Sequence, residues 1–288
     1  MIEMGPNRYG KAAIRLVKLM RDGERHTVRD LTVAVALEGD FGTAHSEGDN
    51  ASVVATDTMK NTIYAFAPEH LTGAIERFGH ALAHHFVDVP QVSAATISID
   101  EHRWVRIPTD DGPSPAAFLR SGDFTRTAEV RATAAGVTTI AGLRDLTVMK
   151  SRGSAFVGFP RDRYTTLAET DDRIMATMVT ANWRYRASAA GSAGFDYDAT
   201  FDAVGATLLE VFAEHHSPSV QASIWIMARA ILEAHPEIDE VRMVLPNLHH
   251  WAVDLTPFGL ENQGEIFVAT REPHGLIDAT VRRGDGAS

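Results

Sequence analysis

Alternating apolar and polar positions near the start of the chain predict β-structure. In residues 29–38 the apolar side chains fall on one face, and they are Leu31, Val33, Val35 and Leu37. This two-residue period is typical of a half-buried strand. Residues 9–20 also read as extended, so we expect the chain to open with a β-hairpin.

After these strand segments, apolar side chains recur at the spacing of a helix. One stripe has members four or three residues apart, namely Leu71, Ile75, Phe78, Leu82 and Phe86. This pattern is typical of a helix that packs on a sheet. A shorter helix is expected to begin at Thr56, and extended segments are expected at residues 92–107, 124–137 and 136–150.

The second half of the chain repeats this order of elements. A strand-like segment at residues 174–186 precedes two helical stripes, Phe201, Val204, Leu208 and Phe212, then Val220, Ile224, Met227 and Ile231. Strands are expected near residues 241–245, 251–255 and 266–269, and an exposed loop at residues 187–194. The repetition predicts a duplicated α+β fold with antiparallel sheets and helices on one side. The expected domains are residues 1–138 and 139–288.

Composition and charge narrow the class of protein. The 288 residues are 44% hydrophobic, which is enough for a sizeable core, and none is cysteine. Disulfides, a thiolate nucleophile and Cys-ligated zinc are therefore excluded. Lys and Arg number 27 against 38 Asp and Glu, so no nucleic-acid partner is expected. With no apolar run near the roughly 18 residues of a membrane span and no signal-like start, we expect no membrane association and a cytoplasmic protein.

Polar side chains in two regions are candidates for chemistry. Thr56 and Asp57 stand where a strand is expected to give way to a helix, and residues 217–221 are expected to open a later helix with a serine cap and Pro218 in its first turn. Helix starts expose amide groups that can bind anions, although most caps serve only the helix. Near the other end of the chain, Asn247 and His249 follow an apolar segment.

Ten short motifs occur along the chain. In chain order they are YGK at 9, ATDTMKNTIY at 55, EHRW at 101, LTVMKS at 146, FVG at 156, RDRYTTLAET at 161, DRI at 172, SPSVQ at 217, PNLHHW at 246 and PHGLI at 273. Together they resemble the motifs of the urate oxidase (uricase) family, and their number, order and spacing make the resemblance specific. It implies two tandem tunnelling-fold (T-fold) domains and a homotetramer that forms a barrel, with active sites at subunit interfaces.

The resemblance also implies a role for each matching residue. Lys11, Thr56 and His249 match the proton-relay triad, and Phe156 matches the aromatic that stacks on the purine. Arg173 and Gln221, with the Val220 backbone, match the groups that hold one purine edge. Thr56 and Asp57 of a neighbouring subunit match those that bind the opposite edge, and Asn247 matches the residue that holds dioxygen or water above the ring.

The implied activity is oxidation of urate by dioxygen and water to 5-hydroxyisourate and hydrogen peroxide, in purine degradation. Urate is a planar anion, so an aromatic face and a planar guanidinium suit it. Removal of a second proton gives a dianion that can reduce dioxygen, so the reaction requires a base and a proton path. We therefore expect no metal or other cofactor.

Simpler interpretations exist for the same residues. Lys11 could be a solvated charge, Phe156 a core residue, and Arg173 a partner of Asp171 or Asp172. His80 and His84 are four residues apart and could hold a metal, but no third ligand is evident, so a surface pair is favoured.

Two other functions are compatible with such a fold. A pterin- or purine-handling enzyme such as a cyclohydrolase would resemble zinc enzymes with Cys ligands, which this chain lacks. A non-catalytic purine-binding protein would need the gripping residues but not Lys11, Thr56 and His249. The chain ends in Asp285, Gly286, Ala287 and Ser288, without the Ser-Lys-Leu type address of eukaryotic relatives, so a peroxisomal location is not expected.

Overall fold

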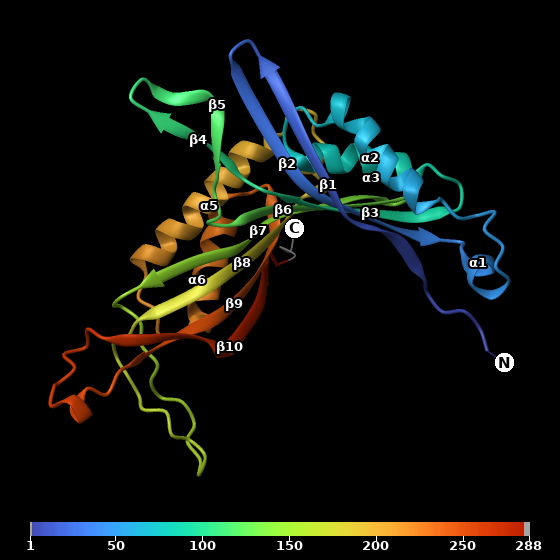
Figure 1. Ribbon diagram of the computed structural model, residues 1–288. Coiled ribbons are helices and arrows are strands. Elements are labelled where there is room, and N and C mark those ends of the chain that lie inside the picture. Colours follow the sequence, from blue (N-terminus) through green and yellow to red (C-terminus); the bar gives the residue numbers. More distant parts are fainter. Residues whose placement is uncertain (1, 285–288) are drawn as a thin grey trace. The chain divides into compact units, whose positions relative to one another are not determined.

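The structure, a computed structural model, describes residues 2–284 (Figure 1). The C-terminal tetrapeptide considered above lies outside the described residues. The strands are β1 (Arg8–Asp22), β2 (Arg25–Gly39), β3 (Val92–Glu101), β4 (Trp104–Thr109), β5 (Gly112–Arg120), β6 (Thr125–Thr133), β7 (Gly136–Lys150), β8 (Met175–Tyr185), β9 (Ile238–Ala252) and β10 (Phe267–Arg282). The helices are α1 (Gly42–Ser46), α2 (Thr56–His70), α3 (Ile75–Val87), α4 (Ala187–Ala190), α5 (Tyr197–Glu214), α6 (Val220–Ala234) and the 3-10 helix η1 (Thr256–Phe258). The α+β class with antiparallel pairing is confirmed.

The chain divides into two compact units. The first unit contains Met1–Gly142 and Arg184–Phe201, and the second contains Leu143–Trp183 and Asp202–Ser288. The chain therefore passes from one unit to the other within β7, β8 and α5. None of the described helices has the length and apolar character that crossing a bilayer requires.

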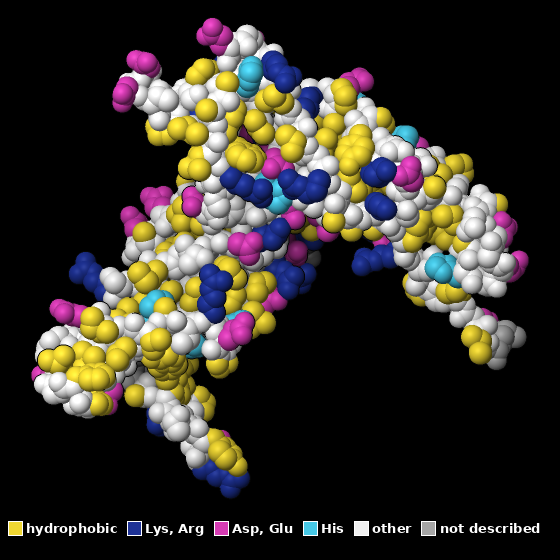
Figure 2. Space-filling view, viewed as in Figure 1, with side chains coloured by type: hydrophobic (Ala, Val, Ile, Leu, Met, Phe, Trp, Pro, Cys, Tyr) yellow, Lys and Arg dark blue, Asp and Glu magenta, His cyan; other side chains and the backbone are white. Residues whose placement is uncertain are grey.

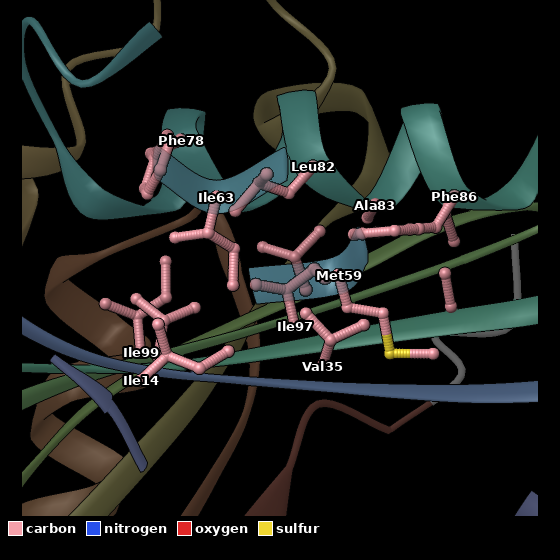
Figure 3. Close-up of a cluster of buried hydrophobic side chains, with 14 of the residues drawn as sticks. Ile14, Val35, Met59, Ile63, Phe78, Leu82, Ala83, Phe86, Ile97 and Ile99 are labelled. Carbon is pink, nitrogen blue, oxygen red and sulfur yellow. The ribbon is translucent and has the colours of Figure 1, made fainter. Parts of the chain in front are cut away.

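In the first unit, β1, β2, β3 and β6 follow one another in an antiparallel sheet. The predicted opening hairpin is confirmed, with Gly23 at its turn in a left-handed conformation (φ 56°). Figure 3 shows how α2 and α3 direct Met59, Ile63, Phe78 and Leu82 toward apolar side chains of the sheet. The predicted stripe from Leu71 to Phe86 is buried along its whole length. It does not lie on one helix as predicted, because α3 begins at Ile75 and Leu71 is the residue that ends α2.

Helix α2 is longer than predicted, because its own stripe was not recognised. Met59, Ile63 and Ala67 are spaced four residues apart and all are buried. At the end of α2, the Lys18 ammonium donates to the carbonyl oxygens of Ala67 and Leu71, each at 2.9 Å. The helix therefore continues to His70 despite Pro68 in its last turn.

Two predicted segments were wrong. The segment 92–107 is two strands, and the second, β4, pairs with β5 in a separate hairpin of mostly exposed residues. Prolines in both strands and the lack of a buried face hide this hairpin from pattern analysis. The segment predicted as an exposed loop at 187–194 contains α4, and Ala190 is buried.

Ion pairs fix Arg184–Phe201 in the first unit. Arg126 donates to the fully buried carboxylate of Glu76 at 2.9 Å and to Asp198 Oδ1 at 2.6 Å. Arg77 donates to the carbonyl oxygens of Ala193 and Phe195. Because a buried carboxylate needs a counter-charge, Arg126 stabilises both α3 and the start of α5.

In the second unit, β9 and β10 pair antiparallel, and α6 packs on both. A separate strand at 251–255 was predicted, whereas β9 runs without interruption through Ala252. The register places Asn247 opposite Gly275 and His249 opposite Thr270, with an irregularity in β10 between these pairs. This irregularity lies beside the two candidate residues of β9.

Candidate functional site

The candidate residues fall into two groups, one in each unit. Lys11, Thr56 and Asp57 belong to the first unit. The larger group belongs to the second unit, and it consists of Phe156, Arg173, Val220, Gln221, Asn247 and His249.

Lys11 lies on β1 at a distortion of the strand. The pairing of β1 with β2 shifts between Lys11 and Ile14, and Ala13 between them has φ 57°. A side chain at Gly10 would put its Cβ 1.8 Å from the Val35 carbonyl oxygen, so only glycine fits this close approach of strands. The Lys11 side chain is exposed, which agrees with its interpretation as a solvated charge in the isolated chain.

Tyr9 connects this strand to the beginning of α2. Its hydroxyl accepts the Val54 amide at 2.7 Å and donates to the Val54 carbonyl oxygen at 3.2 Å. Val54 lies two residues before Thr56. Tyr9 belongs to the YGK motif, but the sequence does not predict this contact, because a bond from a side chain to the backbone leaves no periodic pattern.

Thr56 is the first helical residue of α2 and does not cap the helix. The capping position is Ala55, which has no side-chain acceptor, and residues 53–55 are irregular where a strand had been expected. The amides of the first turn have no intrahelical partner. The start of α2 therefore presents free N–H groups together with the Thr56 hydroxyl.

Asp57 is held within its own helix. Its carboxylate accepts from the Lys60 ammonium at 2.5 Å and from the Asn61 amide at 2.8 Å. These contacts, with a smaller contribution from the Lys11 charge, lower the pKa of Asp57. Its side chain is nevertheless 70% exposed, so it can still accept a hydrogen bond from a ligand.

In the second unit, three separate segments are joined by backbone hydrogen bonds. The Ser217 amide donates to Gly153 at 2.8 Å, and the Ala155 amide donates to Ser217 at 2.7 Å. The Arg173 amide donates to the Ser154 carbonyl oxygen at 2.8 Å. These bonds fix the backbone on which Phe156, Arg173 and the start of α6 are carried.

Phe156 and Arg173 lie side by side. The guanidinium carbon of Arg173 is 5.4 Å from the centroid of the Phe156 ring, and that ring stacks on Phe159 at 4.8 Å. The Asp172 carboxylate accepts the Gly153 amide at 2.6 Å. Burial lowers the pKa of Arg173, and its Nε is buried without a hydrogen-bond partner among the described residues.

A serine caps the start of α6 as predicted, but the cap is Ser219, and Pro218 precedes the helix instead of lying in its first turn. Ser219 Oγ accepts the Ala222 amide at 3.1 Å, and the Ser219 carbonyl oxygen accepts the Ser223 amide. The amides of Val220 and Gln221 remain at the end of the helix, where intrahelical acceptors do not exist. The Gln221 side chain is exposed, whereas Val220 is buried.

His249 lies on β9, partly buried, and its ring stacks on Trp251 with centroids 5.1 Å apart. Burial is the main factor that lowers its pKa, and the charges of Arg173 and His274 lower it further. The neutral form is therefore favoured, and a neutral imidazole can accept a proton. Asn247, two residues earlier, is also partly buried.

The expectation of a surface pair at His80 and His84 was wrong for His80. Its Nε2 lies 2.8 Å from Thr139 Oγ1 and 3.3 Å from the Tyr197 hydroxyl, and burial lowers its pKa to about 4. Both histidines line a cavity of about 350 Å³ in the first unit. The residues that the structure describes contain no group of three or more His, Asp or Glu side chains that could hold a metal ion.

Taken together, the second unit offers an aromatic face, a desolvated guanidinium, helix-end amides and a neutral imidazole. These groups suit a flat, anionic heteroaromatic ligand, which could stack on Phe156 and accept hydrogen bonds at its edge. The first unit offers a second helix end with hydroxyl and carboxylate groups. None of these groups by itself distinguishes one purine from another.

Comparison with known proteins adds this distinction. The family model described as Uricase matches residues 7–131 and 139–278. The chain is 46% identical to a uricase of Arthrobacter globiformis over 98% of its own length and 90% of the relative's, and 40% identical to a uricase of Aspergillus flavus over 96% and 95%. The crystal structure of the Arthrobacter globiformis uricase superposes with a TM-score of 0.92, covering 100% of this chain and 97% of that one. By these matches, and consistently with its motifs, the chain belongs to the uricase family.

Proposed function

We propose that this protein is a urate oxidase, an enzyme that converts urate, dioxygen and water to 5-hydroxyisourate and hydrogen peroxide. Family membership supports the substrate. The observation in the structure that carries the proposal is the Arg173 guanidinium. It lies beside the Phe156 ring, and its buried Nε has no hydrogen-bond partner in residues 2–284. A buried donor without an acceptor is unfavourable, and a ligand edge would satisfy it.

The reaction balances without another reactant. Two electrons leave the purine and reduce dioxygen to peroxide, and the oxygen of water becomes the new hydroxyl group of the ring. The two protons needed for hydrogen peroxide come from urate and water. The protein must therefore hold the ring, remove a proton and return protons to the reduced oxygen.

Recognition is assigned to the second unit. Phe156 holds the plane of the purine, and Arg173 donates in a planar fork to a carbonyl oxygen and a ring nitrogen. Gln221 can donate and accept at once, which suits an edge that mixes C=O and N–H groups. The Val220 amide binds beside them.

Proton transfer is assigned to Lys11, Thr56 and His249. Lys11 serves as the base, and the Thr56 hydroxyl passes the proton toward a neutral His249. The lowered pKa of His249 supports this role, because the imidazole is ready to accept a proton. Asn247 is assigned to dioxygen or water above the ring. Since the urate dianion itself reduces dioxygen, the proposal includes no metal, flavin or haem.

We also propose that the active chain is a homotetramer of paired T-fold domains, residues 1–138 and 139–288, whose sheets close a barrel. The open edges of the described sheets support this: β1 pairs only with β2, and β10 only with β9. Apolar side chains on these strands are exposed, including Val17 (60%), Val268 (49%) and Leu276 (66%). Figure 2 shows apolar side chains at the surface in the region of β10. Unpaired apolar edges are usually covered in the assembled protein.

In this assembly, Thr56 and Asp57 of a neighbouring subunit bind the purine edge opposite Arg173. The free amides at the start of α2 support their role as an anion-binding helix end. A cytoplasmic location remains a prediction from the sequence.

The proposal is tested by adding urate to the purified protein. Ultraviolet absorbance should report loss of urate, and a coupled assay should report one hydrogen peroxide per urate consumed. Activity should persist after dialysis against a strong chelator. Urate binding without turnover would instead indicate a non-catalytic purine-binding protein, and activity that disappears with chelation and returns with a metal would contradict the cofactor-free reaction.

A further inference from the structure

Three hydrogen-bonded side chains, His215, Ser223 and Ser217, lie at the start of α6. We propose that His215, Ser223 and Ser217 are positioning residues that hold the purine-gripping groups of the second unit in register. This inference rests on the proposed function. It concerns residues that touch no substrate themselves.

The three side chains form a continuous hydrogen-bonded series. His215 Nε2 lies 2.8 Å from Ser223 Oγ, which lies 2.8 Å from Ser217 Oγ. At the other side of the ring, His215 Nδ1 lies 2.6 Å from the Val211 carbonyl oxygen. Ser217 and Ser223 are fully buried, so water does not compete for these bonds.

The carbonyl group at one end fixes the tautomer of His215. The Val211 oxygen can only accept, so His215 Nδ1 carries the proton, and in a neutral ring Nε2 is an acceptor for the Ser223 hydroxyl. Burial lowers the pKa of His215, the bond to Val211 opposes this, and the Lys150 and His216 charges lower it further. The Ser217 and Ser223 hydroxyls each also lie 3.2 Å from the Ser219 carbonyl oxygen, at the start of α6.

Ser217 is the point where this series meets the site. Its backbone donates to Gly153 and accepts from Ala155, one residue before Phe156. The Ser154 carbonyl oxygen between them accepts the Arg173 amide. Along the chain, Ser217 is also four residues before Gln221. Fixing Ser217 thus fixes the relative positions of the aromatic face, the guanidinium and the helix end.

Loss of this hydrogen-bonded series should weaken ligand binding more than it lowers the overall stability of the protein. A flat ligand that is stacked and held at its edge tolerates little misplacement, and shifts well below 1 Å weaken several contacts at once. Loss of one buried hydrogen bond alone should also lower stability, whatever its location. The test must therefore separate these two effects.

The chain offers a matched control. In the first unit, Thr139 is a buried hydroxyl residue that lies 2.8 Å from His80 Nε2. Thr139→Val therefore removes the same kind of hydroxyl to imidazole bond as Ser223→Ala. Thr139 belongs to neither group of candidate site residues.

The experiment measures the dissociation constant of a non-reacting azapurine analogue of urate, together with KM, kcat and the thermal midpoint. Ser223→Ala should raise the dissociation constant and KM about 10-fold, with a smaller change in kcat. Thr139→Val should lower the thermal midpoint comparably while changing analogue binding less than about 2-fold. His215→Gln, which keeps an acceptor for Ser223, should retain tighter binding than His215→Leu.

Two results would overturn the inference. One is analogue binding by Ser223→Ala equal to that of the unaltered protein, and the other is equal weakening by Thr139→Val. If Ser223→Ala does not fold, the His215→Gln and His215→Leu pair decides in the same way. If the unaltered protein neither binds the analogue nor consumes urate, the proposed function is wrong as well. This result differs from one in which the unaltered protein is active and only the positioning role of His215, Ser223 and Ser217 is contradicted.

Discussion

The two groups of candidate residues are built in different ways. In the second unit, Arg173 is partly buried, and its backbone is bonded to a segment distant in sequence. In the first unit, Asp57 is 70% exposed, and its hydrogen-bond partners among the described residues are Lys60 and Asn61 of its own helix. One group is fixed by tertiary structure, whereas the other is a helix end presented to solvent.

This difference indicates a division of labour. A desolvated donor such as Arg173 Nε forms a strong bond with an anionic ligand, because little water must be displaced. Exposed groups contribute much less until something covers them. We therefore expect substitution of Arg173 to act mainly on affinity, and substitution of Lys11 to act mainly on turnover.

The largest effect is expected from Arg173→Lys. An ammonium keeps the charge but cannot reproduce the planar fork, and losing such a contact typically costs about 2–5 kcal/mol of binding free energy. The dissociation constant of a non-reacting azapurine analogue should rise accordingly. Arg229→Lys, at an exposed α6 residue paired with Glu233, should leave it unchanged. If Arg173→Lys lowered only the rate, Arg173 would belong to the chemistry and not to recognition.

The second-largest effect is expected from Lys11→Met. Removal of the base should lower kcat roughly 10²-fold or more while analogue binding is retained, because general-base catalysis contributes about that factor. Lys18→Met on the same strand should lower the thermal midpoint, since Lys18 bonds the end of α2, but should leave turnover unaffected. Near-normal turnover by Lys11→Met would remove Lys11 from the relay.

The smallest effect concerns the protonation of His249. Its pKa is lowered below the ordinary value of 6.5, so the ring should be neutral above that pH and should gain a proton only below it. Because the Arg173 charge contributes to this shift, Arg173→Gln should move the titration midpoint of His249 upward. NMR titration of the ligand-free protein measures both midpoints. A midpoint at or above 6.5 in the unaltered protein would contradict the shift.

The strongly periodic parts of the fold could be predicted from the sequence. The opening hairpin was correct, and so was the stripe of α3 from Ile75 onward, because residues such as Leu31 and Phe78 follow a regular period and are buried. The β4 and β5 hairpin was missed because it lacks a buried face. Helix α2 was judged too short because Pro68 and the polar side chains around its stripe obscure the pattern.

The candidate site could likewise be predicted from the sequence only in part. Motifs point to Arg173 and Phe156, but their mutual placement depends on backbone bonds between distant segments, which sequence spacing does not encode. The hydroxyl contacts of Tyr9 and Ser223 are likewise invisible in one sequence. His80 was misjudged because its partners, Thr139 and Tyr197, are distant from it in the chain.

The central claim is that each active site combines the first unit of one subunit with the second unit of another. It is tested most directly by mixing two inactive variants, one altered at Thr56 and one at Arg173, under conditions where subunit exchange is shown to occur. Random mixing in equal amounts should place an intact pair of units at about a quarter of the sites, and urate consumption should return toward that level. Complete absence of activity after demonstrated exchange would contradict the account.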